Sequence, residues 1–173
     1  MARISSCRSI VSAIILSLIS LGASAAGGIA YTQLTSLQSQ PATNPANLVY
    51  LENIDGIQNI GTAPTKVIIN VTGFYFITAV GQAGPVKGGT TGDGYVDMWL
   101  VKNNVSLANT NTRQSVSATI SGTIVTQSIL QLNAGDSISI GFAASNPAYG
   151  LIAIPATRNE PAVTSATLTL YKL

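Results

Sequence analysis

The sequence predicts an all-β protein, a jelly-roll sandwich of about ten antiparallel strands. Three observations support this class. Runs of β-branched and aromatic residues recur at short intervals, and turn signals separate them roughly every 8–12 residues. No segment carries the 3.6-residue apolar period of an amphipathic helix.

The first 25 residues predict export. Arg3 and Arg8 precede an uncharged apolar run, and Ala23-Ser24-Ala25 ends it with the small residues that a signal peptidase recognises. We therefore expect residues 1–25 to be a cleaved secretion signal and the protein to be secreted or exposed at the cell surface. A retained membrane anchor is the alternative, because the uncharged stretch is near the lower limit of the about 17–25 residues that a spanning helix needs. Cys7, the only cysteine, lies in this segment.

Cleavage would change the charge balance. The chain has 8 Lys+Arg and 6 Asp+Glu, so loss of Arg3 and Arg8 leaves six of each and a net charge of zero. Six scattered cations do not form the basic patch that nucleic-acid binding requires, nor one for a membrane surface, so we expect no contact with membranes beyond export. Only 8% of residues are charged, against about 25% in typical domains. This favours self-association or a surface covered by partners or sugars, and an ordinary Ser/Thr/Asn-rich extracellular β-protein is the alternative.

Residues 26–47 are small and polar, and we expect an N-terminal arm there that holds one possible strand at 29–34. The jelly-roll domain is expected over residues 48–173. Its predicted strands are, in chain order, 48–51, 66–71, 74–80, 95–101, 105–108, 118–132, 137–142, 149–154 and 163–173.

The first half of the domain is defined by its turns. Residues 48–51 are β-rich and end before Asp55-Gly56, a turn dipeptide. Gly73 separates the β-branched run 66–71 from the aromatic strand that follows it. A glycine-rich loop is expected over residues 81–93. Beyond it Tyr95, Asp97 and Trp99 alternate with apolar residues, as in a half-buried strand.

The second half begins at a tight hairpin turn, Lys102-Asn103-Asn104, because asparagine tolerates positive φ. Ala134-Gly135-Asp136 is the next reversal, with the Asp136 side chain expected to cap backbone N–H groups. Asn146-Pro147 marks a third turn. A proline-containing loop then precedes the closing strand.

Two segments resemble a known family. Gly73-Phe74-Tyr75-Phe76 and Leu130–Ile140, with its Gly135-Asp136 reversal, resemble the glycine-aromatic strand and the hairpin of the complement C1q globular head and tumour-necrosis-factor-like jelly rolls. Trp99–Asn104 stands where that family has a lysine-asparagine-glycine hairpin, and the closing strand reaches the chain end as it does there. The likeness covers roughly residues 48–173.

The resemblance implies a ten-stranded jelly roll that packs as a homotrimer, binds ligands through its outer loops and has no catalytic residues. The chain departs from the pattern in three ways. It has no collagen-like stalk, Asn104 replaces the usual glycine, and aromatic residues make up only 6% of the chain, which leaves an aromatic trimer axis in doubt.

Three functions remain open from the sequence. The first is a homotrimeric binding module for protein or carbohydrate. The second is a structural subunit of an extracellular fibre or matrix, in which the N-terminal arm adds a strand to the next copy. The third is an enzyme, for which the chain has few catalytic side chains. It has no histidine, and its only cysteine, Cys7, lies in the signal, so Ser-His-Asp, Cys-His and most zinc sites are excluded. Only paired carboxylates such as Asp93 and Asp97 remain for glycoside hydrolysis.

The predicted loops contain candidate ligand-binding residues, and the carboxylates are candidate calcium ligands. We expect Lys87, Arg113, Tyr149 and Arg158 in ligand-binding loops. Asp93 and Asp97, on the solvent face of one strand, are candidate calcium ligands together with carbonyls of the loop 88–94, and a solvated loop without metal is the alternative. We expect no other cofactor.

Two sequons allow glycosylation, at Asn70 and Asn104. Asn104 lies at a predicted hairpin tip, where a glycan has access. Asn70 ends a predicted strand, so we expect it to be less accessible.

Overall fold

The computed structural model of the chain describes residues 30–43, 46–58, 60–63, 65–86, 88 and 91–173, with backbone only for 53–63. The expected secretion signal, residues 1–25, lies outside them. The described residues form fourteen β-strands and no helix. Accordingly, no described helix is long and apolar enough to cross a membrane.

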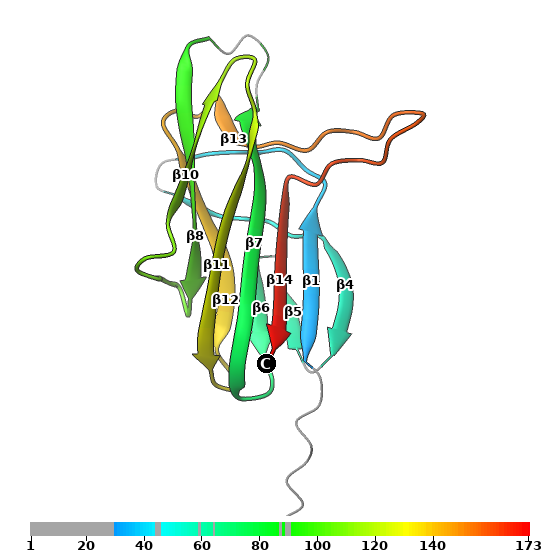
Figure 1. Cartoon of the computed structure of the whole chain (residues 1–173), viewed down its shortest axis with the longest axis vertical. Coiled ribbons are helices and arrows are strands. Elements are labelled where there is room, and N and C mark those ends of the chain that lie inside the picture. Colours follow the sequence, from blue (N-terminus) through cyan, green and yellow to red (C-terminus); the bar gives the residue numbers. More distant parts are fainter. Residues whose placement is uncertain (1–29, 44–45, 59, 64, 87, 89–90) are drawn as a thin grey trace, which may run out of the picture.

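Two seven-stranded antiparallel sheets face each other (Figure 1), as the predicted jelly-roll sandwich requires. Sheet A contains β1 (Tyr31–Ser36), β2 (Gln40–Pro41), β4 (Asn53–Gln58), β7 (Gly73–Pro85), β11 (Gly122–Leu132), β13 (Tyr149–Leu151) and β14 (Ala166–Lys172). Sheet B contains β3 (Asn47–Leu48), β5 (Ile60–Ala63), β6 (Lys66–Ile69), β8 (Asp93–Lys102), β9 (Val105–Ser106), β10 (Thr112–Ser117) and β12 (Ser137–Ala144).

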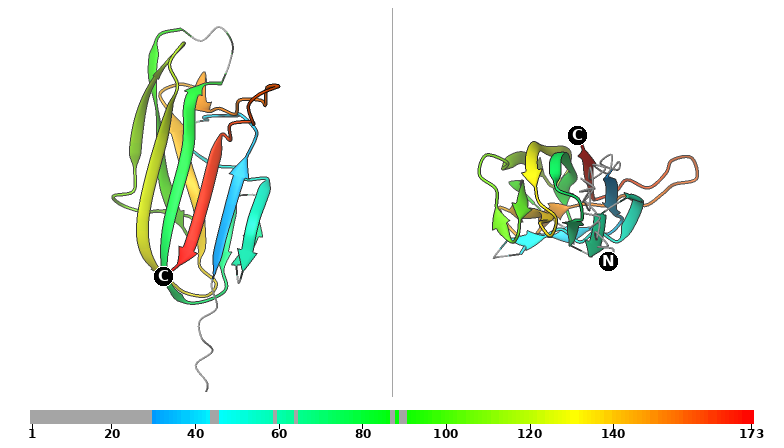
Figure 2. Two further views of the ribbon diagram at one scale, coloured as in Figure 1. Left: turned by 45° about the vertical axis from the view of Figure 1, so that its right-hand side comes forward. Right: turned by 90° about the horizontal axis from the view of Figure 1, so that it is seen from below.

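The core lies between the sheets, because side chains alternate along each strand. Along β7, Tyr75, Ile77 and Ala79 point inward and are fully buried. They belong to one apolar cluster with Met98 and Leu100 of β8 on the opposite sheet. Figure 2 shows the two layers from the side and from below. The outward residues of each sheet are therefore free to form binding surfaces.

The expected N-terminal arm contains β1, which pairs inside its own chain. β1 lies between β14 and β4 in sheet A, with Leu34 opposite Leu168 and Ile54. Leu34 is fully buried in the core. Donation of this strand to another copy would require both ladders to break.

Two sequence-based element predictions are wrong, and one strand was missed. Asp55-Gly56 is not a turn but lies inside β4, where Asp55 pairs with Gln33. The expected loop 81–93 begins as strand, since β7 runs on to Pro85. The strand passes close to Leu151 at position 81, and only glycine fits there, because a Cβ would lie 2.8 Å from Leu151 Cδ2. β10 was not predicted, because its polar sequence has no strand signal of its own.

Two predicted turns are confirmed. Asn103 and Asn104 both have positive φ, 51° and 64°, in the hairpin between β8 and β9. Gly135 has φ of 93° in the turn between β11 and β12. There the Asp136 carboxylate accepts a hydrogen bond from the Asn133 N–H at 2.8 Å, as expected of a capping residue.

Candidate binding surfaces

An apolar row crosses the outer face of sheet A. It consists of Ile129, Phe76, Tyr171 and Tyr31, which lie directly opposite one another on β11, β7, β14 and β1. Their exposed fractions are 61%, 37%, 47% and 40%. Four strands spaced by about 4.8 Å make this row about 14 Å long. Phe74, 54% exposed and two residues from Phe76 on the same face, widens it.

The next row up the same face is polar. Gln127, Thr78, Thr169 and Gln33 lie opposite one another on the same four strands, two residues along from the apolar row. The apolar side chains therefore gather at the lower end of sheet A, near the C-terminus (Figure 1). Contiguous exposed apolar side chains of this kind mark interaction surfaces.

Sequence analysis did not identify the apolar row as a site. A signal was present, since Phe74-Tyr75-Phe76-Ile77 puts large apolar residues on both faces of one strand. That pattern is typical of a strand covered on both sides. Only the register of β11, β14 and β1, however, shows which other side chains complete the row.

The outer face of sheet B carries a different cluster, made of Tyr95, Asp97, Trp99 and Arg113. Arg113 Nε and Nη2 each donate a hydrogen bond of 2.8 Å to the two Asp97 carboxylate oxygens. The Arg113 Cζ lies 3.7 Å from the centre of the Tyr95 ring. The hydrogen bond to Asp97 raises the pKa of Arg113. This bidentate, stacked geometry is specific to arginine.

Trp99 completes the outer-face cluster beside these residues. Its Nε1 donates a 3.0 Å hydrogen bond to Ser106 Oγ. A Cβ on Gly141 would lie 2.5 Å from that Nε1 and 2.6 Å from Cε2, so the indole lies against the glycine backbone of β12. The Trp99 indole N–H, the Asp97 carboxylate and the Arg113 guanidinium of this cluster thus all bind partners within the chain.

This cluster corrects the expected role of Asp97. Its side chain does not reach solvent as a free ligand: the residue is 9% exposed, and both of its carboxylate oxygens bind Arg113. Asp93 is exposed but lies four residues away, about 13 Å along an extended strand. One calcium ion, with ligands at about 2.3–2.6 Å, does not bridge that distance. Among the described residues, no group of three Asp, Glu, His or Cys side chains lies together.

The four expected loop contacts lie in different surroundings. Lys87 falls outside the described residues. Arg113 is on β10 rather than in a loop, and Arg158 is exposed in the segment between β13 and β14. Tyr149 is the clear correction, because it is fully buried in β13 and its hydroxyl donates to the Gly92 carbonyl at 2.7 Å. The structure does not bring the three described residues, Arg113, Tyr149 and Arg158, into one site.

Both sequon asparagines are exposed. For Asn104 this agrees with its position at the β8–β9 turn. For Asn70 our expectation was wrong, since it follows β6 at a surface bend instead of being covered. Glycosylation at either position stays a prediction.

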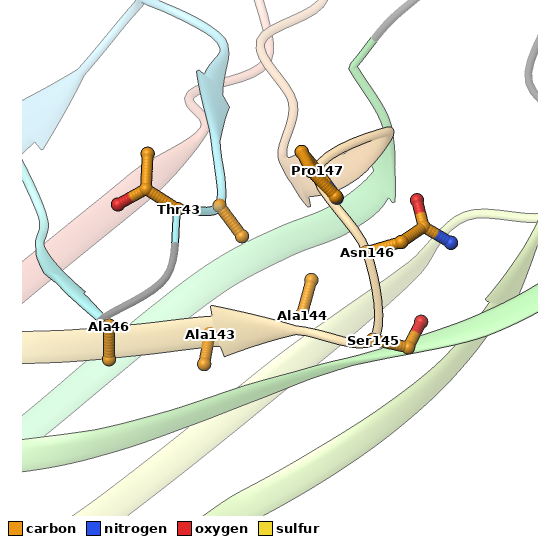
Figure 3. A pocket seen from close by; sticks show the side chains of 8 residues that line it. Thr43, Ala46, Ala143, Ala144, Ser145, Asn146 and Pro147 are labelled. Atoms are coloured by element: carbon orange, nitrogen blue, oxygen red, sulfur yellow. The ribbon is translucent and has the colours of Figure 1, made fainter.

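A hollow with a volume of about 380 Å³ lies where the end of β12 meets the chain before β3 (Figure 3). It is lined by small side chains from the end of β12 and from the chain before β3: Ala42, Thr43, Ala46, Ala143, Ala144, Ser145, Asn146 and Pro147. A second hollow of about 330 Å³ lies between β8 and β10, lined in part by Asp93, Ser117 and Ile120.

The charged turn between β11 and β12 forms one network. Lys102 Nζ lies 2.9 Å from Asp136 Oδ2, and Asn103 Nδ2 donates to Asp136 Oδ1 at 2.7 Å. The hydrogen bonds from the Asn133 N–H and from Asn103, then that from Lys102, lower the pKa of Asp136 to about 2. All these interactions hold two hairpins together, so this carboxylate has a structural role.

No protein-family model and no curated protein sequence matches the chain. Solved structures do. The globular domain of zebrafish complement 1qA protein superposes with a TM-score of 0.54 at 13% identity, covering 83% of this chain and 96% of that one. The crystal structure of murine APRIL at pH 8.0 superposes with a TM-score of 0.53 at 14% identity, and the one at pH 5.0 superposes with a TM-score of 0.53 at 12% identity. Both APRIL structures cover 84% of this chain and 99% of their own. The chain thus has the jelly-roll fold of the C1q globular domain and of APRIL, a tumour-necrosis-factor family protein.

Proposed function

We propose that this chain is a secreted or surface-exposed, non-enzymatic binding module that works as a homotrimer. The observation that carries the proposal is the apolar row on sheet A. Five exposed apolar residues, three of them contributed by β7 and β14, lie together on a flat sheet face. A second copy is the natural occupant, because the low charge of the surface offers little repulsion between copies.

The fold supports the same proposal. The likeness to the C1q globular domain and APRIL agrees with the homotrimer that the sequence resemblance implies. The pairing of β1 inside its own sheet argues against the fibre alternative in its strand-donating form. Catalysis has little support, since the chain lacks histidine and Asp97 is held by Arg113.

The test is the mass of the protein in solution, purified after expression of the full chain and measured by light scattering at several concentrations. We expect a constant mass of three subunits. Ile129→Glu, in the apolar row, should shift the protein to monomer. Gln127→Glu is the matched control, because it puts the same charge two residues away on the same strand face, in the polar row. A wild-type monomer, or an unchanged Ile129→Glu trimer, would contradict the proposal.

Ligand recognition is the second part of the proposal. The hollow between β8 and β10 joins an exposed carboxylate, Asp93, to the exposed apolar side chain of Ile120. Such mixed polar and apolar surfaces suit both protein and carbohydrate ligands. We expect the trimer to bind members of a glycan array or of a panel of extracellular proteins, and Asp93→Ala to weaken that binding. If no probe is bound, or if Asp93→Ala binds as well as wild type, the assignment of this hollow is wrong.

A further inference from the structure

The chain between β13 and β14 projects from the body as a narrow hairpin (Figures 1 and 2). We call residues 152–164 the projecting hairpin. Ile154 and Val163 exchange two backbone hydrogen bonds, of 3.1 and 2.9 Å, and Thr157 N–H donates to the Glu160 carbonyl at 3.0 Å near the tip. The segment is therefore a paired ribbon with a defined shape.

The base of the projecting hairpin is fixed to the body. Ile152 N–H donates to the Gln82 carbonyl at 2.7 Å on one side. On the other, fully buried Ser165 donates its N–H to Ser36 O at 2.8 Å and accepts from Gln82 N–H at 2.9 Å. Two anchored ends give the ribbon a constant direction, away from sheet A past β1 and β4 (Figure 1).

The projecting hairpin shows apolar side chains to water. Ile154 and Val163 are 44% and 41% exposed. They are directly opposed in an antiparallel bridge, so their side chains lie on the same face of the ribbon. An isolated two-stranded ribbon is at best marginally stable in water. This face therefore suits a partner surface that covers both side chains.

The hollow in Figure 3 has complementary chemistry. Five of its eight lining residues are alanine or proline, and none is charged. All three of its polar side chains already have partners: Thr43 Oγ1 donates to Asn47 Oδ1, Ser145 Oγ accepts from Tyr95 N–H at 3.1 Å, and Asn146 Oδ1 accepts from Ala148 N–H at 2.8 Å. Methyl groups thus dominate what the hollow offers, and branched apolar side chains suit it.

The projecting hairpin extends away from the hollow, although its base is hydrogen-bonded, through Ala153 and Ser39, to the segment that leads into it. In Figure 1 the hairpin extends to the right, whereas the cyan chain that leads into the hollow crosses to the left. The view from below in Figure 2 agrees. One chain cannot bring its own two surfaces together, but two copies can. A contact between different surfaces of identical chains closes into a ring or continues as a filament.

We infer that the projecting hairpin of one copy inserts Ile154 and Val163 into the small-residue hollow of the next copy. This contact is separate from the apolar row, which lies at the lower end of sheet A. It rests on the proposed self-association and adds a second, directional contact to it, because each copy gives a hairpin to one neighbour and receives one from another.

The test uses two variants with matched controls. The hairpin variant is Ile154→Asp with Val163→Asp, and its control, Thr157→Asp with Asn159→Asp, adds the same charge at the exposed tip. The hollow variant is Ala46→Trp at an exposed lining position, with Thr119→Trp at an exposed position outside the lining of this hollow as its control. Circular dichroism and thermal unfolding verify that each variant is folded. Light scattering at several concentrations then gives the mass.

We expect both variants to associate at least tenfold more weakly than wild type, and both controls to match wild type. An equimolar mixture of the two variants should exceed either variant alone in average mass, since each mixed pair regains one intact hairpin and one intact hollow. Wild-type masses for both variants, or a mixture that gains nothing, would overturn the inference. So would a hollow variant that behaves as wild type while the hairpin variant dissociates.

The outcomes separate the two proposals. If the hairpin and hollow variants stay trimeric and Ile129→Glu dissociates, the proposed trimer stands and the hairpin contact is wrong. A wild-type mass that grows with concentration and collapses in the hairpin variant would support the hairpin contact and contradict a closed trimer. A monomeric wild type would overturn both.

Discussion

The two outer faces of the sandwich follow the same strand alternation but differ in chemistry. On sheet A, Ile129, Phe76 and Tyr171 are exposed and apolar side by side. On sheet B, the aromatic rings of Tyr95 and Trp99 are each held by a partner, Arg113 and Ser106 respectively. The comparison shows that aromatic residues on a sheet surface do not by themselves mark a binding site. What distinguishes sheet A is apolar area that its own chain leaves uncovered.

The largest expected effect follows from charging the uncovered face. Tyr171→Glu should weaken self-association at least a hundredfold, about 2.8 kcal/mol, because a carboxylate in the centre of an apolar contact has no partner. Ser115→Glu puts the same charge on the exposed surface of sheet B, opposite Tyr95, and should leave the mass unchanged. The measurement is the concentration dependence of mass by analytical ultracentrifugation. Equal effects of the two substitutions would remove the distinction between the faces.

The next effect concerns the packing of Trp99 on sheet B. Gly141→Ala should destabilise the fold by about 1–3 kcal/mol, because the new Cβ would stand 2.5 Å from the indole Nε1. Gly88→Ala is the control, since nothing lies within 4 Å of a Cβ there. Urea unfolding gives the free energy. Trp99 is the only tryptophan, so its fluorescence reports directly whether the ring has moved.

Unchanged stability and fluorescence in Gly141→Ala would mean that the indole is mobile on its strand. The outer face of sheet B would then be as open as that of sheet A. In that case the comparison would no longer assign self-association to one face.

A smaller effect is expected from the ion pair. Arg113→Ala should lower the free energy of unfolding, because it leaves the largely buried Asp97 carboxylate without its two hydrogen bonds. Arg158→Ala removes the same charge from an exposed position and should cost little. Arg113→Lys should recover only part of the loss, since lysine cannot form the bidentate pair. Full recovery with lysine would show that charge alone matters there.

Local signals in the sequence predicted the turns well. Asn103-Asn104 and Gly135-Asp136 are residues whose backbone preferences settle the turn without distant contacts. Local signals fail at Asp55-Gly56. This dipeptide is typical of a turn, but pairing with β1 holds it in an extended strand. β10 is the converse case: Thr112–Ser117 is polar, and only its ladder with β8 makes it a strand.

The candidate sites were harder to predict than the fold because each depends on register. Alternation correctly put Asp97 on the outer face of its strand, but its partner Arg113 is sixteen residues away and is fixed by the pairing of β8 with β10. Tyr149 follows the predicted Asn146-Pro147 turn, yet its ring is buried against Gly94, which has no side chain to occupy that space. The apolar row combines residues from four strands, and no single segment of sequence contains it.

The smallest predicted effect lies at the turn that joins the two sheets. The pKa of Asp136 is lowered to about 2, below the value of about 3.9 for an unfolded chain. A carboxylate with a lowered pKa stabilises the folded state above the unfolded value, and this contribution is lost as the pH falls from about 4 towards 2. Asp136→Asn should therefore reduce stability at pH 7, and the difference from wild type should shrink as the pH falls towards 2.

Urea unfolding of both proteins at pH 7, 5, 4, 3 and 2 measures this difference. The Asp136 network ties the β8–β9 hairpin of sheet B to the turn that leaves β11 of sheet A. The effect should therefore appear in the unfolding free energy while the mass of the assembly at neutral pH stays that of wild type. If Asp136→Asn dissociates the assembly at pH 7 without loss of stability, the lower end of sheet B also takes part in self-association. The apolar row of sheet A would then no longer account for the assembly alone.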